Sequence, residues 1–280
     1  MAKGDKALNA ALSRWAVALA IVVAVGSDLS SARAEISNED LAKLAQNPVG
    51  NLISVPFQNN TNFNYGPDRG VQDILNIQPV VPFGVTEEWN VITRTILPLV
   101  FNPSLGPSAG AVNGLGDLQL TSFLSPAQPG HWIWGVGPIL QIPTHTSATL
   151  GNDNLGLGPS GVILRLEKGN PWVFGALMNN VWSLSTNANA PAFSNGLLQP
   201  FLNYNFEGGL YLTSSPIITM NWLAPANQQL TLPLGGGVGK IFHLGKLPLN
   251  AQLSAYYNVV RPDVGSEWQL RAQVQFMFPR

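Results

Sequence analysis

Hydrophobic and polar residues alternate along most of the chain, and a period of two is typical of β-strands whose two faces meet different surroundings. In the last segment, apolar residues occupy the even positions from Leu270 to Phe278, and polar residues occupy the odd positions from Gln269 to Gln275. Most such segments run 10 to 14 residues, and a tilted strand needs only about 9–11 residues to cross a bilayer. The pattern predicts twelve strands, near 52–65, 71–83, 88–101, 115–124, 131–143, 155–166, 171–184, 196–206, 209–222, 229–242, 247–260 and 267–278.

The connections between these segments alternate in length. Short turns are expected at 84–87, 125–130, 167–170, 207–208 and 243–246, and mostly longer loops rich in Gly, Asn and Pro at 102–114, 144–154, 185–195, 223–228 and 261–267. Short periplasmic turns, longer extracellular loops and an even strand count are typical of outer-membrane barrels. The sequence therefore predicts an all-β fold, a membrane-spanning antiparallel barrel of twelve strands over residues 52–280.

Tryptophan placement supports this interpretation. Beyond the N-terminal segment, every tryptophan lies near the end of a predicted strand: Trp89, Trp132, Trp134, Trp172, Trp182, Trp222 and Trp268. Amphipathic aromatic rings prefer the lipid–water interface, and barrels carry a girdle of them at each interface. We expect the first four in the periplasmic girdle and the last three in the outer girdle. The alternative is that these rings pack at the ends of a soluble β-sandwich.

Composition agrees with a lipid-facing wall. Only 10% of the residues are charged, against about 25% in a soluble domain. A lipid face excludes charge, because Arg or Lys at the bilayer midplane costs roughly 2–4 kcal/mol. The formal net charge of −1 leaves no broad basic surface, so we expect no nucleic-acid partner. The absence of cysteine excludes disulfides and thiolate metal sites.

Residues 1–34 have the pattern of a cleaved signal peptide. Lys3, Lys6 and Arg14 precede an apolar core of 11 residues, Trp15 to Val25, and 32–34 reads Ala-Arg-Ala. Eleven apolar residues are too few for a helical anchor, which must span about 30 Å.

Residues 35–51 form a separate N-terminal segment with a weak helix signal. Ser37 and Asp40 stand at capping-box spacing, and Leu41 and Leu44 share one helical face. We expect this segment to rest in the periplasmic mouth of the barrel and to restrict it. A loose periplasmic leader is the alternative.

Charges within predicted strands should avoid lipid and point into the lumen. These are Arg94, Arg165 and Arg271, with Asp73, Asp117 and Glu167 as possible counter-charges. Asn60 and Asn62 share one face of the first strand and are expected to line the lumen. The alternative is that some of the amides on this face cap the loop beyond the membrane. The charged groups form either a salt-bridge network that fills the barrel or a charged constriction that selects solutes.

No motif indicates catalysis or a cofactor. His131, His145 and His243 lack metal-ligand or triad spacing, and the run Gly235 to Lys240 lacks the spacing of a phosphate-binding loop. We expect no enzyme activity, no cofactor and no metal.

Several short motifs resemble one family. They are Asn47-Pro48 with 52–60 (LISVPFQNN), 65–67 (YGP), 94–98 (RTILP), 114–117 (GLGD), 134–138 (WGVGP), 198–202 (LQPFL) and 278–280 (FPR). Together they resemble the bacterial outer-membrane proteins grouped as the "MetA-pathway of phenol degradation" family, often labelled transporters and sometimes mislabelled neuromedin U. The resemblance spans nearly the whole mature chain. It implies location in the outer membrane of a Gram-negative bacterium, contact with outer-membrane lipid and lipopolysaccharide, and transport of small solutes, with hydrophobic or aromatic ones suggested. The resemblance assigns no catalytic or ligand-binding residues to this chain.

The expected function is therefore a passive outer-membrane channel for a small-molecule solute. A structural or adhesive barrel without transport is the first alternative, and a lipid-modifying barrel enzyme is the second.

Overall fold

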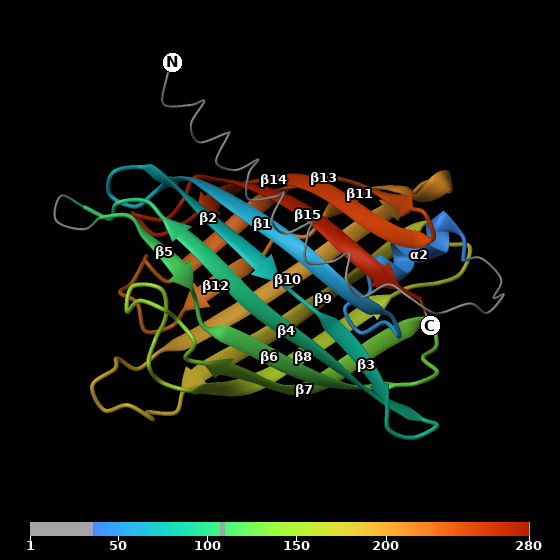
Figure 1. Cartoon of the computed structure of the whole chain (residues 1–280), viewed down its shortest axis with the longest axis horizontal. Helices are drawn as coiled ribbons and strands as arrows, with labels where there is room; N and C mark the ends of the chain where they lie inside the picture. The colour runs from blue at the N-terminus through green and yellow to red at the C-terminus, as the bar shows by residue number, and fades with distance from the viewer. Residues whose placement is uncertain (1–35, 107–109, 280) are drawn as a thin grey trace, which may run out of the picture. The chain divides into compact units, whose positions relative to one another are not determined.

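The computed structural model describes residues 36–106 and 110–279, and the predicted signal peptide lies outside this part. The elements, drawn in Figure 1, are α2 (Asn38–Ala45), β1 (Ile53–Tyr65), β2 (Gly70–Ile77), β3 (Val80–Gly84), β4 (Trp89–Asn102), β5 (Val112–Leu115), β6 (Leu118–Pro126), β7 (Trp132–Ile142), β8 (Gly156–Arg165), β9 (Trp172–Ser183), β10 (Ser194–Asn205), the 3₁₀ turn η2 (Glu207–Gly209), β11 (Leu210–Ser214), β12 (Ile218–Asn221), β13 (Leu230–Leu244), β14 (Leu247–Val260) and β15 (Trp268–Phe278).

The strands form one closed antiparallel barrel. β1 pairs with β15, from Ile53 opposite Phe278 to Phe63 opposite Trp268, and β9 pairs with β10, so the sheet has no free edge. β2 with β3, β5 with β6, and β11 with β12 are each two halves of one interrupted wall strand, which gives twelve wall strands in all. The predicted fold class is confirmed, and each predicted strand has a counterpart in the wall.

The sequence pattern did not reveal the three interruptions. The first falls at Pro79, which has no backbone N–H to donate, although its carbonyl still accepts from Thr95 N at 3.1 Å. The second falls at Gly116 and Asp117, where Thr144 Oγ1 donates to the Gly116 carbonyl at 2.9 Å. The third spans residues 215–217 around Pro216.

The wall has two distinct faces. On β1, Ser54, Gln58, Asn60 and Asn62 are buried and face the lumen, and the residues between them face outward. Large apolar side chains on the outward face of β7 to β14 are exposed, including Val136, Met178 and Leu253. This polar-in, apolar-out arrangement is the one that a strand needs in a bilayer.

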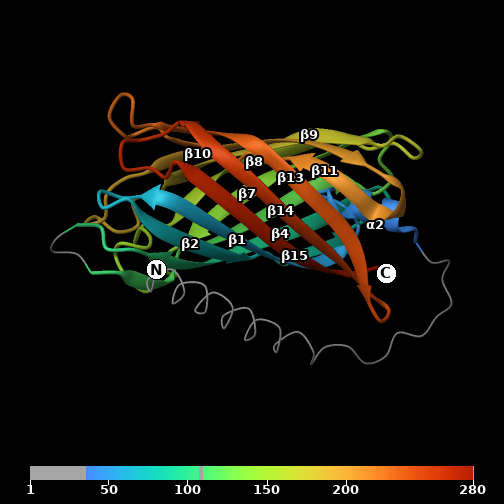
Figure 2. The same ribbon diagram turned by 90° about the horizontal axis from the view of Figure 1, so that it is seen from above.

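Short turns lie at one end of the barrel, and the longer connections lie at the other (Figure 1). Seen from above, α2 lies at the short-turn end, beside β11 (Figure 2). It packs against η2, β10, β11, β13 and β14. Its Leu41 and Ala42 contact the lumen-facing side chains Tyr211, Ile241 and Met277. We call residues 36–52 the mouth segment, because they occupy the short-turn opening from inside.

Local sequence explains α2. Ser37 Oγ accepts a hydrogen bond from Asp40 N at 3.1 Å, Glu39 and Asp40 lie in the first turn, and Lys43 lies in the last. No helix in the described part of the chain is long and apolar enough to span a membrane.

Candidate functional site: the barrel lumen

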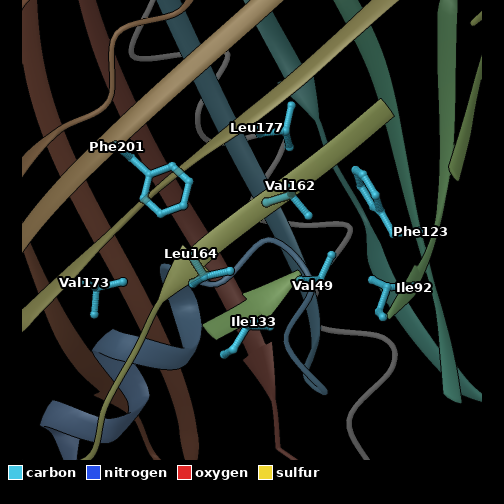
Figure 3. Packing of buried hydrophobic residues seen from close by; sticks show 9 residues of the cluster. All are labelled: Val49, Ile92, Phe123, Ile133, Val162, Leu164, Val173, Leu177 and Phe201. Carbon is cyan, nitrogen blue, oxygen red and sulfur yellow. The ribbon is translucent and has the colours of Figure 1, made fainter. Parts of the chain in front are cut away.

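One side of the lumen is apolar. Nine buried side chains form this wall cluster, which Figure 3 shows: Val49, Ile92, Phe123, Ile133, Val162, Leu164, Val173, Leu177 and Phe201. Eight of them come from β4 and β6 to β10, and Val49 comes from the mouth segment. The mouth segment is therefore anchored to this side of the barrel by burial of Val49, which is 5% exposed.

The opposite side is lined by amides. Gln269 donates to Asn62 at 3.0 Å, Asn62 donates to Gln72 at 2.9 Å, and Gln72 donates to Asn102 at 2.7 Å. This amide ladder crosses β15, β1, β2 and β4, and Asn62, Gln72 and Asn102 are buried. Asn62 and Gln72 each donate and accept a hydrogen bond within the ladder, so the ladder itself is polar without carrying charge.

A cavity of about 150 Å³ lies between the mouth segment and the two sides of the lumen. Its lining includes Leu177 and Phe201 from the apolar side and residues 44–48 of the mouth segment. The remainder is mostly amide and hydroxyl side chains. Two charged side chains line it, Arg94 and Arg271, and no carboxylate does.

Arg94 lies on the lumen face of β4, between Ile92 and Ile96 in the alternation. Its Nη2 donates a 2.6 Å hydrogen bond to Gln78 Oε1 on the segment that joins β2 to β3. Within the described residues, no carboxylate lies within ion-pair distance of this guanidinium. Its positive charge is therefore free to act on the cavity.

Arg271 is 1% exposed and extends from β15 toward the third strand interruption. Nε donates to Asn60 Oδ1 at 3.1 Å, Nη2 donates to Gln269 Oε1 at 3.0 Å, and Nη1 donates to the Ser215 carbonyl at 2.8 Å. The guanidinium lies over the Tyr256 ring, 4.7 Å from its centroid. All of its described partners are neutral, so Arg271 contributes a second net positive charge to the lumen.

Tyr211 closes the same region of the lumen. An ideal Cβ at Gly239 would lie 2.2 Å from the Tyr211 ring, so only glycine lets the ring lie against β13. The Tyr211 hydroxyl donates to Asn250 Oδ1 at 2.8 Å. The glycines of the 235–240 run therefore allow close packing inside a strand, and this run is part of β13.

One polar contact joins the mouth segment to the wall, and a second lies within the segment itself. Gln46 and Asn205 exchange amide hydrogen bonds of 2.8 and 3.2 Å. Lys43, which is 3% exposed, pairs with Glu39 at 2.7 Å within α2. Ile36 packs against the same buried cluster as Leu41 and Ala42. The restriction of flow by residues 35–51 stays a prediction.

Toward the long-loop end, the lumen opens into a vestibule of about 370 Å³. Its lining contains Gln119, Gln141, Asn179, Asn195 and other neutral residues, and no charged side chain. The positive charges are therefore concentrated at the narrow central cavity.

The prediction that Arg165 points into the lumen is wrong. Arg165 lies opposite Trp132 and Phe174, whose rings pack on each other on the outer face. It is at the end of β8, where its Nη2 reaches Glu167 Oε2 in the turn at 3.1 Å. This hydrogen bond, followed by the charge of His131, lowers the pKa of Glu167. The pair thus lies outside the lumen, at the strand end, where an outward charge is tolerated.

Asp73 also lies on the outer face, contrary to the prediction. It stands opposite Thr61, which alternates with the inward Asn60 and Asn62. Thr61 Oγ1 donates to Asp73 Oδ1 at 2.6 Å, and Asn59 Nδ2 donates at 3.3 Å. These neighbours satisfy the carboxylate locally, so it does not serve as a counter-charge for either lumen arginine.

Asp117 lies at the second strand interruption, away from Arg94 and Arg271. His145 joins it: Nδ1 is 2.6 Å from Asp117 Oδ1, and Nε2 is 3.1 Å from Asp153 Oδ1. Asn152 N also donates to Asp117 at 2.7 Å. The group ties the loop after β7 to the wall, and the sequence spacing gave no sign of it. Across the described residues, no three His, Cys, Asp or Glu side chains are placed to hold a metal ion.

The tryptophans lie at strand ends with outward rings. At the short-turn end, Trp89 packs on Trp134 and Trp172 packs on Tyr204. At the long-loop end, Trp268 packs on Tyr257, and Trp182 and Trp222 are about half exposed.

No protein-family model matches the sequence, and no curated protein matches it. Among solved structures, the chain is similar to the COG4313 outer membrane channel from Pseudomonas putida F1, with a TM-score of 0.61 and 17% identity over 90% of this chain and 100% of that chain. It is also similar to the β-domain of the Bordetella autotransporter Brka (TM-score 0.46, 11% identity, 81% and 99% covered) and to outer membrane phospholipase A from Escherichia coli (TM-score 0.44, 11% identity, 88% and 99% covered). At these identities the likeness concerns the fold, which is the barrel of bacterial outer membrane proteins, and the first structure is consistent with the family that the motifs resemble.

Proposed function

We propose that the protein is a passive channel for small solutes in the outer membrane of a Gram-negative bacterium, delivered there through a signal peptide cleaved after residue 34. In this setting the outward tryptophans form the two interface girdles, and outer-membrane lipid and lipopolysaccharide contact the wall. The lumen acts by size, charge and hydrogen bonding, without chemical conversion of the solute.

The central cavity carries this proposal. Arg94 and Arg271 both line it, and no described carboxylate neutralises either. In a narrow lumen with low-dielectric walls, two uncompensated positive charges attract anions and repel cations. The solute best suited to this cavity is small and carries a carboxylate or another negative group.

The apolar side of the cavity adds a second criterion. Leu177 and Phe201 line it beside the arginines and the amides. A solute with an apolar body and an anionic end would contact both kinds of surface. This description is compatible with the aromatic solutes that the family resemblance suggests, provided that they carry a negative charge.

Reversal potentials in planar bilayers test the proposal. Under a KCl gradient we expect the wild-type channel to prefer chloride, and Arg94→Gln to reduce the chloride-to-potassium permeability ratio about two- to tenfold, equivalent to roughly 0.4–1.4 kcal/mol. Lys168→Gln is the matched control, because it removes one positive charge from an exposed turn. An unchanged ratio in Arg94→Gln and Arg271→Gln would exclude the charged constriction. Absence of any conductance, even after removal of the mouth segment, would favour a structural or adhesive barrel.

A further inference from the structure

The outer wall has a hollow that is separate from the lumen. It measures about 1170 Å³ and lies over β7, β8, β9, β10 and β12, toward the long-loop end. Val136, Met178, Trp182 and Trp222 line it, and each is about half exposed, so these side chains face outward. The β9–β10 ladder behind it is paired without a gap from Trp172 to Trp182.

Small residues form the floor of this hollow. Pro138 on β7 lies opposite Pro159 on β8, and Gly161 lies opposite Val136. A Cβ added to Gly161 would have one neighbouring atom within 4 Å, the Gly135 carbonyl oxygen at 4.0 Å. The space above Gly161 is therefore open. Proline is normally confined to edge strands, because it cannot donate to the ladder.

The two prolines weaken the ladder on both sides. In the β8–β9 ladder, Leu157 pairs with Trp182 and the next pair is Ser160 with Asn179, so the two positions between these pairs on each strand are unpaired. In the β6–β7 ladder, Thr121 pairs with Ile139 and the next pair is Leu124 with Val136, so the two positions between these pairs on each strand are likewise unpaired. The pairing of the wall is therefore interrupted beside Pro138 and beside Pro159, on the strands that form the floor of the hollow.

Several polar groups around the hollow are paired with one another. Trp222 Nε1 donates to Asn180 Oδ1 at 2.6 Å, and Ser160 Oγ donates to the Met178 carbonyl at 3.3 Å. A polar ligand would find few free partners here. Two methionines, Met178 and Met220, contribute adaptable side chains to an otherwise apolar lining.

We propose that this hollow binds an acyl chain of a membrane lipid. The hollow faces the bilayer, its lining is apolar, and acyl chains are the apolar groups that surround a barrel wall. A second copy of this chain is the competing occupant, and the oligomeric state of the Gly161→Leu variant distinguishes it from an acyl chain. The bound chain lies over Gly161, between Val136 and Met178, and extends to Trp182 and Trp222.

Energy transfer from tryptophan to cis-parinaric acid, a fluorescent fatty acid, tests this site on the full-length protein in detergent. We expect saturable binding to the wild type and a half-saturating concentration at least tenfold higher for Gly161→Leu, whose side chain fills the hollow. Ala255→Leu, on the exposed outer face of β14 and outside the hollow, is the matched control and should bind as the wild type does.

A second variant keeps the test decisive if Gly161→Leu fails to assemble, which heat-modifiable gel migration reports. Met178→Ala shortens the rim and should weaken binding several-fold. A non-saturating signal that is equal in all variants would overturn the proposal, and so would a dimer that Gly161→Leu converts to a monomer. Planar-bilayer conductance of Gly161→Leu should equal that of the wild type, and a change would assign the hollow to the solute path instead. Loss of the channel function itself would leave the parinaric acid result unaffected.

Discussion

Arg271 Nη1 donates a 2.8 Å hydrogen bond to the carbonyl of Ser215, so a side chain of β15 satisfies the backbone of a strand interruption 56 positions earlier. The same guanidinium faces the central cavity. Arg271 thus combines a structural contact with a lumen charge, whereas Arg94 has one described side-chain partner, Gln78.

The two arginines should therefore differ in their effects on stability. Arg271→Gln leaves the Ser215 carbonyl without its donor in a buried setting, which should lower the free energy of unfolding by about 1–3 kcal/mol. Arg94→Gln should lower it by less. Thermal unfolding in detergent, followed by circular dichroism, measures both. Equal losses in the two variants would contradict a special role for the Ser215 contact.

The mouth segment should respond to a charge at Val49. This side chain is 5% exposed within the apolar wall cluster, and Val49→Asp would bury a carboxylate without a partner. We expect the segment to leave its place and the single-channel conductance to rise, as it should on deletion of residues 35–48. Val264→Asp, in a loop at the other end and 52% exposed, is the control. Equal conductance in Val49→Asp and the wild type would show that the segment does not limit flow.

Gly239→Ala should disturb the lumen through Tyr211. The added Cβ would lie 2.2 Å from the ring, so the ring must move away from Asn250. We expect a loss of about 1–3 kcal/mol, typical of overpacking. Gly130→Ala is the comparison, because nothing lies within 4 Å of its Cβ position. Thermal unfolding of both variants gives the result, and equal stability would contradict the packing inferred at β13.

An acid-sensitive contact lies at the long-loop end. Glu267 accepts hydrogen bonds from Arg69 at 2.8 Å, Asn64 at 2.8 Å and Arg261 at 2.8 Å. The hydrogen bond from Arg69 is the largest cause of a lowered pKa for Glu267, and the charge of Arg261 adds to it. The stabilisation is therefore fully present above the unfolded pKa, about 4.3, and is lost as the pH falls through the lower folded value.

Hydrogen–deuterium exchange of residues 66–69 and 261–267 at pH 6 and pH 3 tests this contact. After correction for intrinsic rates, the two segments should exchange faster at pH 3. In Glu267→Gln the exchange should be fast at both values. A wild type whose corrected exchange is the same at both values would rule out the acid-sensitive link.

The barrel was predictable because the alternation of hydrophobic and polar residues recurs in strand after strand. An apolar outer face and amides inside produce a period of two, and single apolar residues on the inward face, such as Ile139, do not hide it. The interruptions were not predictable, since their backbone groups are satisfied by distant residues, as Ser215 is by Arg271.

The side that each charge faces was harder to predict. Alternation divides a strand into two faces but does not indicate how near a residue lies to the strand end. Arg165 and Arg94 both lie within predicted strands, yet Arg165 is next to a turn that holds Glu167. The Asp73 carboxylate is satisfied by Thr61 of the neighbouring strand, and predicting this contact requires the register between the two strands. His145 contacts Asp117 and Asp153, and the spacing of these residues in the sequence does not indicate that they meet.

The place of α2 has a consequence for the order of assembly. The helix precedes β1 in the chain, but its binding surface is built from η2, β10, β11, β13 and β14, and Gln46 meets Asn205 across 159 positions. Contacts this distant in sequence form only after most of the chain has been placed. The same N-terminal part of the chain leads directly into β1, the strand whose pairing with β15 closes the wall. Docking of α2 and closure of the wall are therefore both late events of folding, and both depend on the start of the described chain meeting strands near its end.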